Sequence, residues 1–413
     1  MISNRHPLPA LPEPLRGSDP DSFAERTVKI RMPDIARRTL SENNFPPQIA
    51  ANLQALIDEI PFGAIRKVHD PGAPDQADWE DYAGPHLGQN WLEIPWFFGE
   101  HYFYRRIVEA TGFFQPGPWE GRDPYASQKR AGLETSQQVT QALVKNLERS
   151  LEAGWERKSF LRLLNADLWG NQADLSLWPA GEGDGPAHEE DVQREHLLVD
   201  DALAITGLFG EMRDRPGRVD FLVDNAGFEL ISDLCLADYL LSTTPSFTVR
   251  LELKPHPTFV SDAMAKDVLE TVAFLGESDD PGVSRLADRL QMNLDSERLQ
   301  LREDYFWTSP LESWKMPPQV REELASAALV INKGDAQYRR LLGDRHWPYT
   351  TPLNIILSYF PRPLVILRAS KSEVMAGIEP GLEDRLFQED PEWLYNGRWG
   401  LIQLFQPAEA GSS

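Results

Sequence analysis

The sequence predicts an α/β fold, with a mostly parallel sheet flanked by helices and an all-helical domain before it. Three observations lead to this prediction. The first half of the chain places apolar residues at helical spacing and shows no clear strand alternation. The second half alternates short apolar runs with helical stretches. Between the halves, residues 180–190 (AGEGDGPAHEE) are polar and rich in glycine, which is typical of a boundary loop.

The first half is expected to contain a flexible, proline-rich arm over residues 1–24 and a helical domain over residues 25–180. Three helices are expected within this domain, over residues 49–60, 91–107 and 139–151. The first follows two prolines, which suit the start of a helix. The second is crowded with aromatic residues and is therefore expected to be buried. The third ends near Gly154.

The second half is expected to form a Rossmann-like α/β domain over residues 181–405, followed by a short tail over residues 406–413. Four strands are predicted, over residues 219–223, 247–253, 328–332 and 364–367. A helical pattern follows each of the first three strands, and the second of these helices is expected from about Asp262 to Leu275. This alternation predicts a parallel sheet that is covered by helices on both faces.

Composition excludes several classes of function. The 413 residues include 41 basic and 64 acidic side chains, so the net charge is −23 and no basic run offers a nucleic-acid or anionic-membrane surface. No apolar run approaches the roughly 18 residues of a membrane helix, and the first residues lack an apolar signal region. The single cysteine, Cys235, excludes an intramolecular disulfide and cysteine-rich zinc sites. A cytoplasmic location is therefore expected.

Polar side chains follow all four predicted strands, where open parallel sheets bind ligands. These residues are Asp224 and Asn225 after the first strand, Lys254, His256, Ser261 and Asp262 after the second, Lys333, Gly334 and Asp335 after the third, and Arg368 and Lys371 after the fourth. Carboxylate and amide oxygens suit Mg²⁺ or Mn²⁺, and lysines hold phosphate oxygens. The inventory therefore indicates a divalent cation beside an anionic ligand.

Each of these groups, taken alone, has a simpler interpretation as turn chemistry, helix capping or a solvated surface pair. The histidines show no metal-type spacing, and Cys235 lies in an apolar helix as a core residue. The chain has no phosphate-binding loop of the G-x-x-x-x-G-K-[ST] type and no G-x-S-x-G motif. The glycines near residue 183 follow no strand, so they are not a dinucleotide-binding fingerprint.

Several longer runs resemble the damage-control phosphatase family, specifically its eukaryote-type branch, which includes a protein also described as a protein-glutamate methyltransferase. These runs are PWFFGEHYFYRRI (95–107), LWGNQADLS (168–176), DFLVDNAGFELISDLCLADYLL (220–241), HPTFVSDAM (256–264), INKGDAQYRRLLGDRHWP (331–348) and RASK (368–371). The resemblance extends over roughly residues 25–405, and the proline-rich arm matches no family motif.

The resemblance implies a metal-dependent phosphatase acting on phosphate esters, including sugar phosphates such as fructose 1-phosphate and fructose 6-phosphate. It implies that Asp224, Asn225 and Asp262 hold the metal and contact substrate, with Mn²⁺ expected first and Co²⁺ or Ni²⁺ as alternatives. It also implies that Lys333 holds the phosphate, with Gly334 and Asp335 beside it. The remaining positions that it implies are Glu100 and Asn171, expected to face the site from the helical half, and Arg368 and Lys371 of an R-x-x-K motif, with either a substrate-binding or a structural role.

Two other functions remain open at this point. One is methyl transfer from S-adenosylmethionine to protein carboxylates, which the same branch implies. Against it, no glycine-rich nucleotide loop follows the first strand, and that chemistry has no need of a divalent cation. The other is a non-catalytic, metal-stabilised binding module. Release of phosphate with and without Mn²⁺ would distinguish the three.

Overall fold

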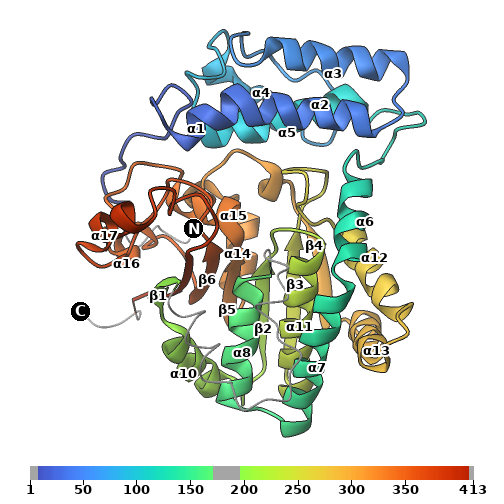
Figure 1. Ribbon diagram of the computed structural model, residues 1–413, viewed down its shortest axis with the longest axis vertical. Helices are drawn as coiled ribbons and strands as arrows, with labels where there is room; N and C mark the ends of the chain where they lie inside the picture. Colours follow the sequence, from blue (N-terminus) through green and yellow to red (C-terminus); the bar gives the residue numbers. More distant parts are fainter. Residues whose placement is uncertain (1–7, 171–195, 409–413) are drawn as a thin grey trace.

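The computed structural model describes residues 8–170 and 196–408 and is built on one seven-stranded sheet (Figure 1). The strands are β1 (Leu197–Asp200), β2 (Gly217–Leu222), β3 (Phe247–Leu253), β4 (Leu299–Glu303), β5 (Leu329–Lys333), β6 (Leu364–Ala369) and β7 (Gly400–Phe405). Their order in the sheet is β1-β7-β6-β5-β2-β3-β4. All neighbouring strands are parallel except β6 and β7, which are antiparallel. The predicted α/β class with a mostly parallel sheet is confirmed.

Helices precede and flank this sheet. The helical layer before it contains α1 (Phe23–Arg26), the π-helix η1 (Thr27–Arg31), α2 (Met32–Glu42), α3 (Pro47–Glu59), α4 (Gln76–Ala83), η2 (Gly84–His86) and α5 (Trp96–Thr111). The others are α6 (Ala126–Thr135), α7 (Gln137–Ala153), α8 (Arg157–Leu168), α10 (Ala202–Met212), α11 (Phe228–Thr243), α12 (Ala265–Gly276), α13 (Pro281–Asp295), η4 (Tyr305–Thr308), η5 (Ser313–Lys315), α14 (Pro318–Ala325), α15 (Gly334–Leu342), α16 (Leu353–Ile356) and α17 (Leu382–Glu389). The helices expected over 49–60, 91–107 and 139–151 correspond to α3, α5 and α7.

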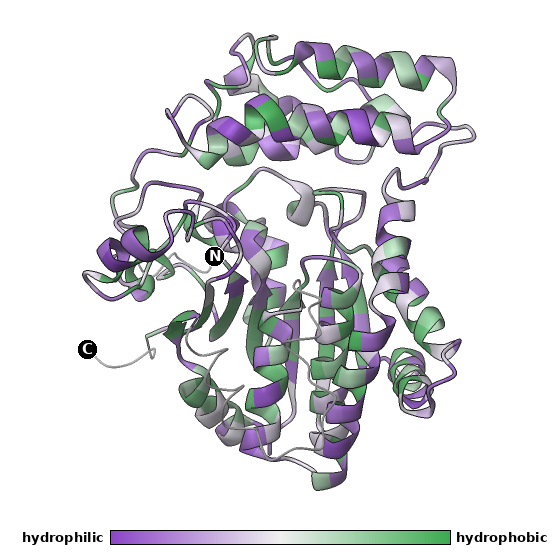
Figure 2. Cartoon of the chain, in the orientation of Figure 1, coloured by the Kyte–Doolittle hydropathy of each residue, from purple (hydrophilic) through white to green (hydrophobic). Residues whose placement is uncertain are grey.

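The central strands are largely buried on both faces, because helices cover the sheet from both sides (Figure 2). Alternate residues of β5 enter different cores: Val330 packs with α14, α15 and the helical layer, whereas Ile331 packs with α7, α8 and α11. This explains why β2, β3, β5 and β6 were visible in the sequence as short runs rich in apolar residues, although Asp220 interrupts β2 and Arg250 and Glu252 interrupt β3. The strands β1, β4 and β7 were not predicted. β4 (LQLRE) lies at one edge of the sheet and is only partly buried, so its polar residues hide the pattern.

The helical layer lies across one end of the α/β part, at the top of Figure 1. The described part of the proline-rich arm joins the two, because the Leu15 N–H donates to the Asp344 carbonyl (2.9 Å) and the Leu15 carbonyl accepts from the Trp96 N–H (2.8 Å). Helices α7 and α8 come from the first half of the chain but pack on α11. The domain limits at residues 24, 180 and 405 stay predictions, and the boundary loop at 180–190 lies outside the described residues. Within the described residues, no helix is long and apolar enough to cross a membrane.

Candidate active site

The loops after β2 and β3 are joined by backbone hydrogen bonds, and this brings the predicted metal ligands together. The two strands are parallel neighbours in register, so they end at the same edge of the sheet. Beyond them, the Ala226 N–H donates to the Ser261 carbonyl (2.7 Å), and the Ala263 N–H donates to the Asp224 carbonyl (2.9 Å). Asn225 and Asp262 form an isolated antiparallel bridge between these bonds. Asp224, Asn225 and Asp262, which come from two separate loops, therefore lie next to one another.

The side chains at this place form a short polar chain. The Asn225 amide donates to Asp224 Oδ2 (2.8 Å) and to Glu229 Oε2 (2.8 Å). The Ser261 hydroxyl donates to Asn225 Oδ1 (2.6 Å). Asp224 is 6% exposed, and its Oδ1 is buried without a hydrogen-bond partner among the described residues. One carboxylate oxygen is thus left with nothing to satisfy it.

The positive charge near this cluster neutralises only part of its negative charge. The Lys254 ammonium pairs with Asp262 Oδ2 (3.1 Å) and donates to the carbonyls of Val223 and Asp224, but it makes no ion pair with the Asp224 carboxylate. Burial raises the pKa of Asp224 well above its ordinary value, and the charges of Asp262 and Glu229 raise it further. Burial also raises the pKa of Asp262. The site therefore favours the arrival of a cation.

Gly334 lets the end of β5 come close to Asp224. Its φ is +79°, and a Cβ added at this position would lie 1.9 Å from Asp224 Oδ2. No other residue fits there without displacing the carboxylate. This close contact explains why a glycine follows Lys333 at the end of β5.

Lys333 lies beside Gly334 but its ammonium is held by two other aspartates. It pairs with Asp167 Oδ1 of α8 (2.7 Å) and with Asp233 Oδ1 of α11 (3.2 Å), and it also donates to the Asp167 carbonyl. Burial alone would lower the pKa of Lys333, but these two carboxylates outweigh it and raise the pKa. Sequence reasoning missed both partners, because neither has a signature beyond a lone aspartate within a helix. The phosphate contact of Lys333 stays a prediction.

The R-x-x-K motif divides into two different environments. Arg368 is fully buried, pairs with Asp335 Oδ1 (2.7 Å), donates to the Ser372 carbonyl (3.1 Å) and lies 4.1 Å above the Tyr338 ring. The Asp335 carboxylate also accepts from the Lys371 backbone N–H (3.1 Å). This network favours the structural alternative for Arg368. The Lys371 side chain makes no ion pair with the described residues, and its charge lowers the pKa of Asp224.

Glu100 lies on α5, next to the site, and its charge is already paired. It forms an ion pair with Arg339 of α15, and Arg339 pairs in turn with Asp344 (2.7 Å). On the same helix, the rings of His101 and Tyr104 each lie 4.9 Å from the ring of Phe259, in the loop after β3. The helical layer therefore covers the strand ends where the site lies. The other expected residue of the helical half, Asn171, lies outside the described residues.

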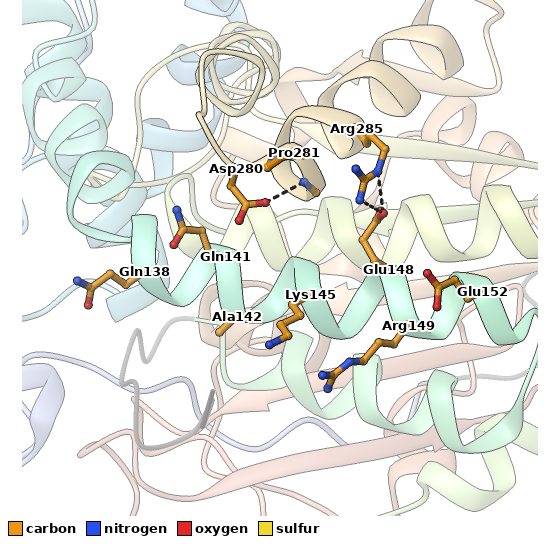
Figure 3. Close-up of a pocket in the computed structure, with 11 residues that line it drawn as sticks. Gln138, Gln141, Ala142, Lys145, Glu148, Arg149, Glu152, Asp280, Pro281 and Arg285 are labelled. Carbon is orange, nitrogen blue, oxygen red and sulfur yellow. Dashed lines mark hydrogen bonds and ion pairs between the residues drawn. The ribbon is translucent and has the colours of Figure 1, made fainter. Parts of the chain in front are cut away.

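A wider groove lies elsewhere, between α7 and the start of α13 (Figure 3). Its volume is about 940 Å³, and among its lining residues are Lys145, Arg149, Glu148 and Arg285. Arg285 is paired with Glu148 (2.7 Å). The groove contains none of the predicted site residues, so its size gives no reason to move the site from the strand ends.

The donor set at the strand ends fits a hard divalent cation. Among the residues that the structure describes, no three His, Cys, Asp or Glu side chains are arranged to hold a metal. The predicted ligand set has only two carboxylates, however, and its third member is an amide. The unsatisfied Asp224 oxygen, beside a second carboxylate and the Asn225 side chain, provides the oxygen ligands and the negative charge that such a cation prefers.

Comparisons with known proteins agree with the motifs. The sequence pattern of the damage-control phosphatase ARMT1-like domain matches residues 27–386. The damage-control phosphatase ARMT1 of Danio rerio is 30% identical over 96% of this chain and 97% of its own length. That of Mus musculus is 33% identical over 77% of this chain and 75% of its own length. The crystal structure of a DUF89 family protein from Pyrococcus horikoshii aligns with a TM-score of 0.46 and 12% identity, covering 90% of this chain and 95% of that one.

The resemblance predicted from the sequence motifs is confirmed by the length of the match, which includes all the strand-end loops described above. The chain belongs to the damage-control phosphatase ARMT1-like family and is a phosphatase, that is, a hydrolase.

Proposed function

We propose that this phosphatase hydrolyses small phosphomonoesters, sugar phosphates such as fructose 1-phosphate and fructose 6-phosphate, with a divalent cation at the ends of β2 and β3. Its family consists of metabolite-repair phosphatases that generally depend on a divalent metal ion. Asp224, Asn225 and Asp262 are the proposed ligands. Mn²⁺ is the cation that we propose first, and Co²⁺ and Ni²⁺ are the alternatives.

One observation carries this proposal: the buried Asp224 carboxylate forms no ion pair with any described residue and has an oxygen without a hydrogen-bond partner, although Asp262 and Glu229 add negative charge beside it. A buried carboxylate that has no ion pair and only one hydrogen-bonded oxygen is costly to charge, so it shifts its pKa or binds a cation. Asp224 lies at a strand end of an open parallel sheet, which is where ligands bind in such sheets. A divalent cation held here would still bind phosphate oxygens, because three protein ligands leave several of its coordination positions open.

When bound, the cation would polarise a phosphoryl oxygen and lower the pKa of its bound water. The other proposed roles belong to the chain itself. Helices α11 and α15 begin at Phe228 and Gly334, next to the carboxylates, and their first N–H groups are available to phosphate oxygens. The Lys371 ammonium adds positive charge on the same side. A contact between Lys333 and phosphate requires this lysine to give up part of its pairing with Asp167 or Asp233.

The test measures phosphate release from fructose 1-phosphate, fructose 6-phosphate and p-nitrophenyl phosphate. Protein stripped of metal by a chelator is compared with the same protein after addition of Mn²⁺, Co²⁺ or Ni²⁺. We expect release only with metal, and its loss in Asp262→Asn. The matched control is Asp304→Asn, since Asp304 follows the neighbouring strand β4 and, among the described residues, its side chain bonds to the Phe306 N–H and to Arg302.

Undiminished phosphate release by the chelated protein would contradict the metal dependence. Methyl transfer from labelled S-adenosylmethionine without phosphate release would favour the methyltransferase alternative and overturn the proposal.

A further inference from the structure

A second pocket lies next to the candidate site, where α1 and η1 meet the loops that follow β6. Its volume is about 330 Å³, and its lining residues include Phe23, Arg26, Arg31, Lys371, Glu392 and Tyr395. Three of these side chains are cations and one is a carboxylate, in a chain whose net charge is −23. The sequence drew attention only to Lys371, because the arginines belong to the first half of the chain.

Three contacts hold the walls of this pocket together. The Phe23 N–H at the start of α1 donates to Glu373 Oε1 (2.8 Å), two residues after Lys371. The Phe23 and Tyr395 rings are stacked, with centroids 5.1 Å apart and an interplanar angle of 11°. The Gly397 N–H donates to the Ser370 carbonyl (2.9 Å). These contacts fix α1, the R-x-x-K loop and the turn around Tyr395 relative to one another.

The cations of this pocket are free to bind an anion. Arg26, Arg31 and Lys371 form no ion pair with any described carboxylate, whereas most arginines near the site, such as Arg339 and Arg368, do. The Arg31 guanidinium lies 4.9 Å from the centroid of the Phe23 ring, which restrains it without neutralising it. Solvation alone would explain one unpaired arginine at the surface. Here three unpaired cations line one cavity of a chain whose net charge is −23, so the local field at this cavity is opposite to that of the chain as a whole.

The pocket adjoins the carboxylate site. The Lys371 N–H donates to Asp335 Oδ1 (3.1 Å), and Gly334, the residue before Asp335, lies against Asp224 Oδ2. One wall of the pocket is therefore hydrogen-bonded to the loop that contacts the candidate site. A ligand with one end at Asp224 and Asp262 would therefore direct its other end towards Arg26 and Arg31, with Lys371 between them.

We propose that this pocket binds a second anionic group of the substrate, at the end opposite the phosphate that is cleaved. The proposal rests on the proposed function and narrows it: the preferred substrates carry two anionic groups, as sugar bisphosphates do. Two guanidinium groups bind phosphate or carboxylate oxygens through charge-assisted hydrogen bonds, and their planar donor geometry suits both anions. The negative charge of the rest of the chain makes such local cations necessary for binding a doubly charged ligand.

The test compares substrates that differ only in the second anion. Fructose 1,6-bisphosphate is paired with fructose 6-phosphate, and 3-phosphoglycerate with glycerol 3-phosphate. For each pair the ratio of kcat/KM is measured in the wild type, in Arg26→Gln/Arg31→Gln and in the control Lys29→Gln. Lys29 is an exposed cation of η1 that is paired with Glu25 and does not line this pocket.

We expect the wild type and Lys29→Gln to favour the doubly charged member of at least one pair by about tenfold, chiefly through KM, and the double variant to reduce that ratio to about one. A drop for the bisphosphate pair identifies phosphate as the second group, and a drop for the other pair identifies carboxylate. Ratios that are the same in all three proteins would overturn the proposal.

A binding measurement keeps this test independent of catalysis. Fructose 1,6-bisphosphate is titrated into metal-free protein, and the rise in melting temperature is recorded. We expect the rise in the wild type and in Lys29→Gln but not in the double variant. If no protein hydrolyses any ester while this difference remains, the proposed function fails and the pocket assignment stands. If the rise is equal in all three proteins, the pocket assignment fails.

Discussion

Two pairs of buried aspartates lie near neighbouring strand ends of the same sheet, and they differ in how completely ion pairs neutralise their charge. At the end of β5, Lys333 forms ion pairs with both Asp167 and Asp233. At the ends of β2 and β3, Lys254 pairs with Asp262 alone, and Asp224 forms no ion pair with any described residue. After burial, the strongest influence on the pKa of Asp233 is the opposite charge of Lys333, whereas for Asp224 it is the like charge of Asp262.

This difference separates a structural cluster from a binding cluster. A lysine that contacts both carboxylates holds α8, α11 and β5 together and leaves no demand for an ion from solution. A lysine that contacts one carboxylate and two carbonyls leaves a negative site beside the partly exposed Asn225 and Ser261. A buried aspartate is therefore not by itself the sign of a binding site. The sign is a buried aspartate that lacks an ion pair.

The largest expected effect comes from Asp224→Asn, which removes the unpaired charge and keeps the shape of the side chain. We expect kcat/KM for phosphate esters to fall about a thousandfold or more, equivalent to about 4 kcal/mol of transition-state stabilisation. The melting temperature of the metal-free variant should equal or exceed that of the wild type, because a costly buried charge is gone.

The matched variant Asp233→Asn lies in the paired cluster and should keep the rise in melting temperature on addition of Mn²⁺. Asp224→Asn should lose that rise. Near-normal turnover together with an unchanged response of Asp224→Asn to Mn²⁺ would remove the distinction between the two clusters.

Lys333→Met tests the other cluster, and its main effect is on stability. The substitution leaves Asp167 and Asp233 buried without their cation, so the free energy of unfolding should fall by about 3–5 kcal/mol. Denaturant unfolding of the metal-free protein measures this loss. Adding Asp233→Asn to the same protein should restore part of the lost stability, because one of the two buried carboxylates left without a cation is then neutral. A loss below about 1 kcal/mol would show that the cluster does not hold the fold together.

Glu252 of β3 is an intermediate case, a buried carboxylate with one neutral donor. Its Oε2 accepts from Trp307 Nε1 (3.1 Å), and Arg302 Nε lies 4.0 Å away. Burial raises the pKa of Glu252 to about 7. Between the ordinary glutamate pKa and about 7, the folded protein holds a proton that the unfolded chain has released, so this group makes stability fall as pH rises through that window.

Glu252→Gln should therefore stabilise the protein by about 2–3 kcal/mol at pH 8 and by little at pH 4. Denaturant unfolding at several pH values measures the difference between the two proteins, in which the contributions of other groups cancel. A difference that does not grow between pH 4.5 and pH 7 would mean that the glutamate is paired well enough to ionise normally.

The smallest effects are expected in the wide groove of Figure 3, where every charge is solvated or paired at the surface. Lys145→Gln and Arg285→Gln should leave kcat/KM within about twofold. The second variant should cost no more than about 1 kcal/mol of stability, since Arg285 is 57% exposed and its pair with Glu148 is screened by water. A fall of more than about fivefold in kcat/KM would place chemistry in this groove and weaken the contrast between the two aspartate pairs.

Several features of this protein were readable from its sequence. The buried strands β2, β3, β5 and β6 were visible because helices cover both faces, so apolar residues predominate in each run even where charged residues such as Asp220 and Glu252 interrupt it. The polar residues at their ends were visible because a buried parallel strand must end in a loop that carries them. Asp224, Asn225 and Asp262 were among these strand-end residues, since parallel strands end at one edge, and the family resemblance singled them out as the metal ligands. The strand-end residues themselves need only local pattern and the rules of sheet topology.

Only the tertiary structure determines which of the buried charged side chains form ion pairs and which do not. Lys333 is paired because α8 brings Asp167, 166 positions earlier in the chain, against the end of β5. Glu100 is paired because α5 brings it to Arg339, which is 239 positions later. Arg26 and Arg31 line a pocket with Lys371 because α1 is anchored to Glu373. The energy of a buried charge depends on groups within a few ångströms of it, and sequence position does not tell which groups those are.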